Sequence, residues 1–259
     1  MKNTMKKIYL ILMLFYLYAP IMVLVVLSFN EARSRVVWGG FSLKWYKDLF
    51  TNQAVLSALR TTLVIAFVSA LAATVLGTLA CLGINRMRRA PRTIVMGMNN
   101  IPMMNADIVT GISLMLCFMA FGVTLSLNTV LLAHITFNVP YVILSVMPKV
   151  RQMEGSTYEA ALDLGASPVY AFFKVVVPDL LPGILSGFLM AFTMSLDDFV
   201  ITHFTTGAGV NTLSTLVYSE VRRGIKPTMY ALSTLMFVSV LVLLILINVR
   251  PQKKKDVVE

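Results

Sequence analysis

Three carboxylates lie in stretches of the chain that are otherwise apolar enough to cross a membrane: Asp107, Asp197 and Asp198. No lysine or arginine lies at a similar depth in these stretches, so we expect the three acids to be protonated or to pair with a cation supplied from outside the chain. A charge at the centre of a membrane helix costs about 2.5–3.5 kcal/mol on insertion scales and commonly marks a functional site. Because carboxylates bind ammonium groups by charge-assisted hydrogen bonds, the sequence predicts a passage for an organic cation.

The polar residues around the last two carboxylates repeat with helical spacing. Ser195, Asp198, Thr202 and Thr205 are separated by three, four and three residues, which is one face of a helix. We expect this stripe to line the pathway. Adjacent helical residues point about 100° apart, so Asp197 would face a neighbouring helix or a partner subunit. The alternative for each acid is a structural role, in hydrogen bonds to polar groups nearby or in an ion pair between subunits.

A polar region around residues 150–180 carries the signals of two short helices. Ser156 and Glu159 form a capping box that predicts a helix starting at Ser156. Gly165 can adopt the left-handed conformation that ends such a helix. Ser167 followed by Pro168 predicts the start of the second helix.

The short helix at Glu159 has two interpretations. In the simpler one, Glu159 only caps the helix. In the other, the helix and its smooth face of Ala160 and Ala161 insert into a groove on a partner protein. A capped and exposed loop between two membrane spans favours a partner. Pro178 and Pro182 are expected to separate this loop from the next span.

The composition excludes several classes of protein. The chain has 259 residues, of which 58% are hydrophobic and 13% charged, whereas a soluble domain has about 25% charged residues. The net charge of +10 is spread between apolar runs, so nucleic acid is not an expected partner. Cys81 and Cys117 lie in apolar runs, and His134 and His203 are not spaced like metal ligands. Without a nucleotide-binding or catalytic motif, we expect this chain to have no catalytic residue, no cofactor and no metal.

Six stretches are long and apolar enough for membrane helices of about 20 residues. They are Ile8–Phe29, Val55–Ile84, Ile94–Phe121, Leu125–Met147, Leu181–Phe204 and Thr228–Val249. The third contains Asn99, Pro102 and Asn105, and such interruptions are tolerated only where protein or a watery cavity satisfies the backbone. The first is too long for a signal peptide. We therefore predict an all-α membrane protein with one transmembrane domain over residues 1–259.

The positive charges predict the orientation of these spans. Fourteen of the 22 lysines and arginines fall on one side: Lys2, Lys6, Lys7, Arg86, Arg88, Arg89, Arg92, Lys149, Arg151, Lys174, Arg250, Lys253, Lys254 and Lys255. By the positive-inside rule this side, with both termini and the Glu159 loop, is cytoplasmic. The outer loops are then Asn30–Ala54 and Thr205–Pro227. The first is rich in aromatic residues, which form an interfacial belt or place Trp45 at the pore entrance.

Several motifs resemble the permease subunits of bacterial ABC importers. Glu159-Ala160-Ala161, Gly165 and Pro178 stand at the positions of that family's signature loop, with Val175 and Val177 in place of its usual Ile and Leu. Further motifs are similar to the C-type permease of spermidine/putrescine importers. These are Tyr18-Ala19-Pro20, Trp38-Gly39-Gly40-Phe41-Ser42 with Lys44-Trp45-Tyr46, Asp107-Ile108-Val109-Thr110-Gly111, and Phe192-Thr193-Met194-Ser195-Leu196-Asp197-Asp198.

The resemblance implies a type I ABC importer permease fold with six transmembrane helices, in which loop 151–178 couples to an ATPase through Glu159, Ala160, Ala161 and Gly165. It also implies the partners: a second, B-type permease, a homodimeric ATPase that binds ATP and Mg, an extracytoplasmic polyamine-binding protein, and the lipid bilayer of a bacterial inner membrane. The pathway residues would be Asp107, Asp197, Asp198, Ser195, Thr202 and Trp45.

Three alternatives remain at this point. The permease could carry another small organic cation, or an organophosphorus compound, although an anionic cargo fits poorly beside three acids. The chain could also be an ion-coupled secondary carrier that uses the acids as proton relays, although six spans without an evident inverted repeat argue against it. The sequence does not distinguish putrescine from spermidine as the cargo.

Overall fold

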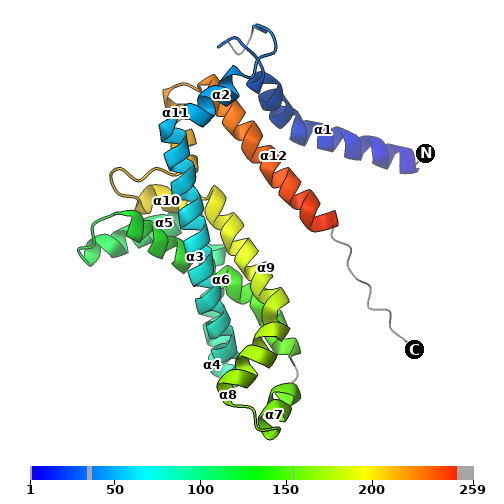
Figure 1. The fold of residues 1–259 in the computed structure, drawn as a ribbon, viewed down its shortest axis with the longest axis vertical. Helices are drawn as coiled ribbons and strands as arrows, with labels where there is room; N and C mark the ends of the chain where they lie inside the picture. The colour runs from blue at the N-terminus through cyan, green and yellow to red at the C-terminus, as the bar shows by residue number, and fades with distance from the viewer. Residues whose placement is uncertain (1, 34–36, 154, 250–259) are drawn as a thin grey trace. The chain divides into compact units, whose positions relative to one another are not determined.

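The computed structural model describes the backbone of residues 2–33, 37–153 and 155–249, and this part of the chain is helical nearly throughout (Figure 1). Its helices are α1 (Lys2–Ser28), α2 (Lys44–Thr51), α3 (Gln53–Arg86), α4 (Arg89–Met104), α5 (Asp107–Ala120), α6 (Leu127–Gln152), α7 (Gly155–Asp163), α8 (Pro168–Ala171), the π-helix η1 (Phe172–Val176), α9 (Val177–Asp197), α10 (Val200–Thr205), α11 (Leu213–Arg223) and α12 (Pro227–Val249). The predicted all-α class is confirmed, since the described residues add only an isolated bridge between Asn30 and Phe41.

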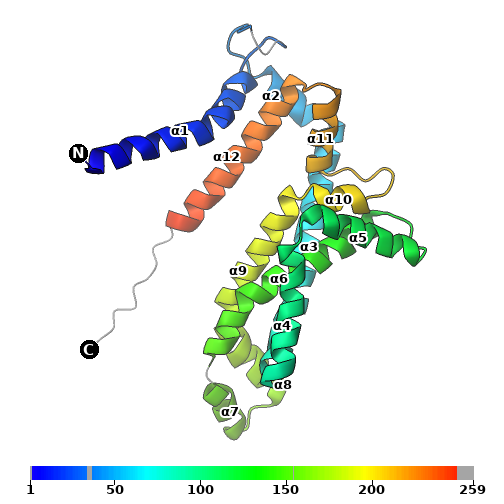
Figure 2. The same cartoon turned by 180° about the vertical axis from the view of Figure 1, so that it is seen from behind.

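The chain forms two compact units. One consists of Met1–Leu56 and Val217–Glu259, and the other of Ser57–Leu216. In the first unit α12 contacts α1 and α2. In the second unit α6 packs along α9, as both ribbon views show (Figure 1, Figure 2). The prediction of a single transmembrane domain is not tested by this division.

Helices occupy all six predicted spans. Four helical stretches are long and apolar enough to cross a membrane: Met5–Ser28, Gln53–Arg86, Leu127–Gln152 and Pro168–Asp197. The pair α4 and α5 adds a fifth if it counts as one broken span. The last predicted span coincides with α12, whose side chains from residue 242 onward lie outside the described residues. The total of six therefore stays a prediction.

The third span is broken, as its polar residues predict. α4 and α5 meet at an angle of 106° across Asn105 and Ala106. The backbone N–H of Asn105 still donates to the carbonyl of Ile101 at 3.2 Å, so α4 closes regularly before the chain turns. As a result Asp107 becomes the first residue of a new helix.

The fifth span differs from its prediction at both ends. Pro178 and Pro182 do not separate it from the loop, because the helix runs without interruption from Pro168 to Asp197. Pro178 lies in the first turn of α9, directly after the π-helical turn η1. Proline has no N–H to donate to the carbonyl four residues earlier, and the irregular hydrogen bonding of the π-turn accommodates this loss. At the other end the predicted single helix breaks at Asp198 and Phe199, and α10 follows as a separate helix.

Small residues allow the helices of the second unit to approach closely. Gly183, Gly187 and Ala191 repeat every four residues along α9 and are all buried. A Cβ atom built on Gly187 would lie 3.3 Å from a methyl carbon of Val142 in α6, and one on Gly77 of α3 only 2.7 Å from the same carbon. Since lipid offers no hydrophobic drive for helix association, such close van der Waals contact is what holds membrane helices together.

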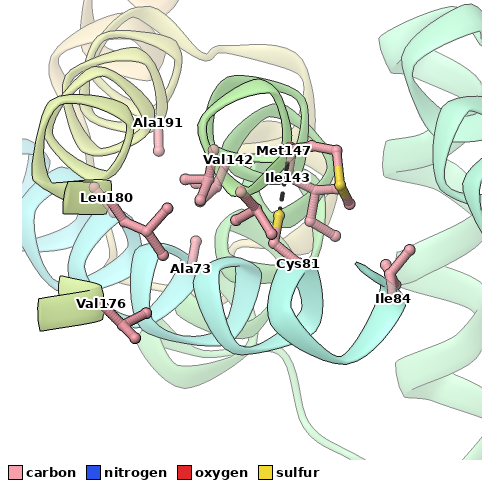
Figure 3. Packing of buried hydrophobic residues seen from close by; sticks show 12 residues of the cluster. Ala73, Cys81, Ile84, Val142, Ile143, Met147, Val176, Leu180 and Ala191 are labelled. Carbon is pink, nitrogen blue, oxygen red and sulfur yellow. Dashed lines mark hydrogen bonds between the residues drawn. The ribbon is translucent and has the colours of Figure 1, made fainter. Parts of the chain in front are cut away.

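A cluster of buried apolar residues fills the space between these helices. Figure 3 shows Leu180 and Val142 pointing toward the same space, with Cys81 of α3 beside Ile143 of α6. The Cys81 thiol donates to the Ile143 carbonyl at 3.5 Å. Cys81 and Cys117 are both free thiols, and Cys81 serves here as a small packing residue.

Candidate functional site

The break between α9 and α10 is organised by the side chain of Asp198. Its carboxylate accepts hydrogen bonds from the backbone N–H groups of Ile201 at 3.2 Å and Thr202 at 2.8 Å. The Thr202 hydroxyl donates to the same carboxylate at 2.9 Å. The backbone carbonyl of Asp198 accepts from the Ser214 hydroxyl at 2.7 Å. Asp198 therefore caps α10, because the first N–H groups of a helix have no partner within it.

A buried histidine of α6 completes this arrangement. The Nε2 atom of His134 lies 2.9 Å from the Thr202 hydroxyl and 3.4 Å from the Asp198 carboxylate. Its Nδ1 atom lies 2.5 Å from the Ser195 hydroxyl, which is 3.1 Å from the hydroxyl of Ser69 in α3. These five residues, which we call the His134 network, connect α3, α6, α9 and α10.

Every side chain of the His134 network has a hydrogen-bond partner within it. The Nε2 atom of His134 bonds with the Thr202 hydroxyl, which donates to the Asp198 carboxylate. Its Nδ1 atom bonds with the Ser195 hydroxyl, which bonds in turn with that of Ser69. All of these side chains are buried, and the Asp198 side chain is 7% exposed. A fully satisfied polar network in a low-dielectric interior is rigid and fixes a unique arrangement of its helices.

These contacts correct two expectations drawn from the sequence. Asp198 does have a partner within the chain, because His134 supplies it from another helix. The four residues of the polar stripe do not lie on one continuous helix, because α9 ends before Asp198. Ser195, Thr202 and Thr205 are also buried between helices of this chain. Their predicted place along a pathway has no support from this geometry, and no role for His134 is predicted from the sequence.

One signal in the sequence could have identified His134. It is an ionisable residue in the middle of the predicted span Leu125–Met147, and such residues usually face the protein interior and pair with another polar group. Its partner could not be named, because a histidine in one helix and an aspartate in another can meet only if the packing of the helices brings them together.

The other two carboxylates are exposed and lie near each other. Asp197 is the last residue of α9, and Asp107 is the first of α5. α5 packs against α10, and Gly111 allows a close approach, since a Cβ atom there would lie 3.4 Å from the Val200 carbonyl oxygen. Asp197 directly precedes the break before α10, and Asp107 begins the helix that packs against α10, so the two acids lie in the same region. The two acids thus form an exposed anionic site beside the buried network.

The helix ends give these two acids different surroundings. The N-terminal end of a helix carries partial positive charge and the C-terminal end partial negative charge. Asp107 at the start of α5 is therefore in a favourable position for an anion. Asp197 lies at the end of α9, where the last carbonyl groups of the helix carry partial negative charge. A cation bound there is stabilised by the carboxylate and by this helix end.

Trp45 is buried in the first unit. It lies in α2, is 4% exposed, and donates from its indole N–H to the backbone carbonyl of Asn30 at 2.7 Å. The Asn30 side chain in turn binds the Val37 carbonyl at 2.9 Å and the Gly39 N–H at 2.8 Å. These bonds give Trp45 a structural role in holding the loop before α2.

The region of Glu159 contains the two short helices that the sequence predicts. Gly165 has φ +86°. Its N–H donates to the Leu162 carbonyl, and the N–H of Ala166 donates to the carbonyl of Ala161, which together form a Schellman motif. The second helix starts at Pro168, and the Ser167 hydroxyl accepts from the N–H of Tyr170. Both predictions are confirmed.

The first of these helices starts at Gly155, one residue before its predicted start. The side chain of Ser156 lies outside the described residues, so the capping box stays a prediction. Glu159 and Ala160 are exposed, while Ala161 is half-buried. α7 therefore has an exposed surface that includes Glu159 and Ala160.

Known proteins share this architecture and much of this sequence. A bacterial ABC transporter involved in alginate import has the same fold, with a TM-score of 0.72 at 15% identity, covering 95% of this chain and 92% of that one. Putrescine permease PotI of Escherichia coli (strain K12) is 40% identical over 227 residues, or 85% of this chain and 81% of PotI. Spermidine/putrescine permease PotC of Haemophilus influenzae is 40% identical over 231 residues, or 89% of this chain and 90% of PotC.

The fold and these relatives define the class of protein: this is the membrane subunit of an ABC importer. Residues 73–250 match the family model of the binding-protein-dependent transport system inner membrane component. The chain belongs to this family, as its signature loop predicts. It is thus a multi-pass inner-membrane transport component.

The structure predicts different consequences for mutations of the two adjacent aspartates. Asp198→Ala removes the cap of α10 and the carboxylate that Thr202 and His134 contact, and a hydrogen bond to a charged group contributes about 1.5–3 kcal/mol. We expect a marked fall in the thermal unfolding temperature of the purified protein in detergent. The matched control Asp197→Ala removes an exposed carboxylate one residue away and should unfold near the wild-type temperature. Equal unfolding temperatures for the two variants would contradict the structural role of Asp198.

Proposed function

We propose that this chain is one membrane subunit of an ATP-driven importer of polyamines. The observation that carries the proposal is its 38–40% identity, over most of the chain, to permeases named for putrescine or spermidine transport. Identity of this extent supports a shared class of cargo. Polyamines carry several ammonium groups on a flexible chain, so they require acidic or carbonyl groups along their path.

In this proposal the exposed acids Asp107 and Asp197 contact the substrate. Asp197 offers a carboxylate together with the negative end of α9, and Asp107 offers a second one in the same region for a multiply charged ligand. Ammonium groups would bind both acids by charge-assisted hydrogen bonds. Ser195, Asp198 and Thr202 would act indirectly, because the His134 network holds the break that leaves Asp197 at a helix end.

We propose that both termini and the α7–α8 loop face the cytoplasm, as the distribution of Lys and Arg favours. A second, B-type permease would complete the pathway, and an extracytoplasmic binding protein would deliver the polyamine. A homodimeric ATPase would bind ATP and Mg and would grip α7 through Glu159, Ala160, Ala161 and Gly165. Because the helix is continuous from Pro168 to Asp197, movement of the loop would be transmitted along this helix to Asp197 at its other end.

Neutralising the exposed acids should reduce transport without loss of assembly. Asp197→Asn and Asp107→Asn each remove a charged partner for an ammonium group, an interaction worth about 1.5–3 kcal/mol. We expect ATP-driven uptake of putrescine or spermidine into proteoliposomes to fall about tenfold or more for each variant. The control is Asp179→Asn, which neutralises an exposed acid in the first turn of the same helix. Normal uptake by both variants would contradict the proposal that Asp107 and Asp197 contact the substrate.

The role of Glu159 in coupling can be separated from capping. Glu159→Ala should lower co-purification of the ATPase and the ATP hydrolysis that substrate stimulates, because an exposed contact is lost. The control is Asp163→Ala, which removes an exposed acid at the end of the same helix. If Glu159→Ala keeps normal co-purification and coupling while only the stability of the protein falls, Glu159 is a cap alone.

A further inference from the structure

A cavity of about 490 Å³ opens where α3 ends, α4 begins and α6 ends. Three arginines line it, namely Arg89, Arg92 and Arg151, together with polar Asn85 and buried Val150. We call it the arginine cavity. It lies in the second unit, at the end of α6 that is far from α5 and α10 (Figure 1, Figure 2).

The three arginines reach the cavity from two different helices. Arg89 is the first residue of α4, and Arg92 follows one turn later on the same side of the helix. Arg151 lies in the last turn of α6, against which α4 packs. The cavity therefore results from tertiary packing and is more than a run of basic residues in a loop.

The positive charge of the cavity is not neutralised within the described residues. Their two ion pairs are His134 with Asp198 and Lys226 with Glu220, and neither involves an arginine. The N-terminus of α4 also has no side-chain cap, so its partial positive charge adds to that of the guanidinium groups. Arg89 and Arg151 are exposed and Arg92 is partly exposed, so their guanidinium groups are accessible to an anion in this open cavity.

The donors suit a phosphate group. Guanidinium groups bind phosphate oxygens in pairs, and the N-terminus of a helix adds to the attraction. The Thr93 hydroxyl also lines the cavity but already donates to the Arg89 carbonyl at 3.0 Å, so the arginines and Asn85 supply the donors. The volume exceeds that of a water in the liquid, about 30 Å³, many times over, and leaves room for a glycerol beside the phosphate.

The location of the cavity indicates a lipid as the source of that phosphate. α3 and α6 are both long and apolar enough to span a membrane, and the cavity lies where both reach their ends. If these ends mark the membrane boundary, the cavity lies near the headgroups, where basic pockets between membrane helices bind anionic lipids. We propose that the arginine cavity binds the headgroup phosphate of an anionic phospholipid. With the orientation proposed above, this lipid belongs to the cytoplasmic leaflet, whereas the binding itself depends on neither that orientation nor the cargo.

Lipid titration of the full chain, purified in detergent with its co-purifying subunits, tests the proposal. Phosphatidylglycerol is added stepwise, and bound lipid is measured by native mass spectrometry. In the Arg89→Gln/Arg92→Gln variant we expect affinity for phosphatidylglycerol to fall about tenfold or more. The matched control is Arg86→Gln/Arg88→Gln, which removes the same charge from exposed residues that do not line the cavity. This control should bind within about twofold of wild type, since a tenfold change requires about 1.4 kcal/mol.

Two outcomes of the titration would overturn the proposal. Equal weakening in both double variants would show a general effect of surface charge. Displacement of phosphatidylglycerol by millimolar inorganic phosphate would show that the cavity takes a free anion and not a lipid. If the cavity variant does not fold, wild-type protein is crosslinked to phosphatidylglycerol with a photoreactive headgroup. Crosslinks are expected within residues 85–93 and 150–153, and their absence there would contradict the site.

Discussion

The carboxylate of Asp198 is the charge on which the arrangement of this permease depends. A carboxylate in a membrane span must be satisfied by the protein itself. His134, the Thr202 hydroxyl and two backbone N–H groups do so. Because only the start of a helix offers free N–H groups, this solution requires the fifth span to break at Asp198. The break ends α9 at Asp197, and that second carboxylate is left exposed at the negative end of a helix.

The need to satisfy polar groups within the membrane also explains the break in the third span, which packs against the fifth. Polar residues break that span at Asn105 and Ala106, and α5 starts at Asp107. Gly111 allows α5 to pack closely on α10, which the His134 network fixes in place. Two broken spans thus bring two exposed acids together. Close packing of α6 on α9 supports the pair, and the continuous helix from Pro168 links it to the loop proposed to meet the ATPase.

Most helices could be predicted from the sequence because their signals are local. Apolar length gave the long helices, and the Gly165 turn and the Ser167 cap follow from single-residue preferences. The break at Asp198 has no such signal, since neither glycine nor proline lies there. The break depends on the buried Asp198 carboxylate, whose partner His134 lies more than 60 residues away in the chain. Helical spacing predicted which polar residues recur together but could not show whether they face a pathway or another helix. Pro178 does not end the helix, because the irregular π-helical turn before it allows the helix to continue through the proline.

The central claim is that Asp197 faces the pathway while Asp198 does not. Cysteine accessibility tests it most directly, in a background with Cys81→Ala and Cys117→Ala. A positively charged thiol reagent should modify the Asp197→Cys variant rapidly, and putrescine or spermidine should slow that reaction. The buried Thr202→Cys variant should react slowly, with no effect of polyamine. Rapid, polyamine-protected labelling of Thr202→Cys, together with unprotected Asp197→Cys, would contradict the account.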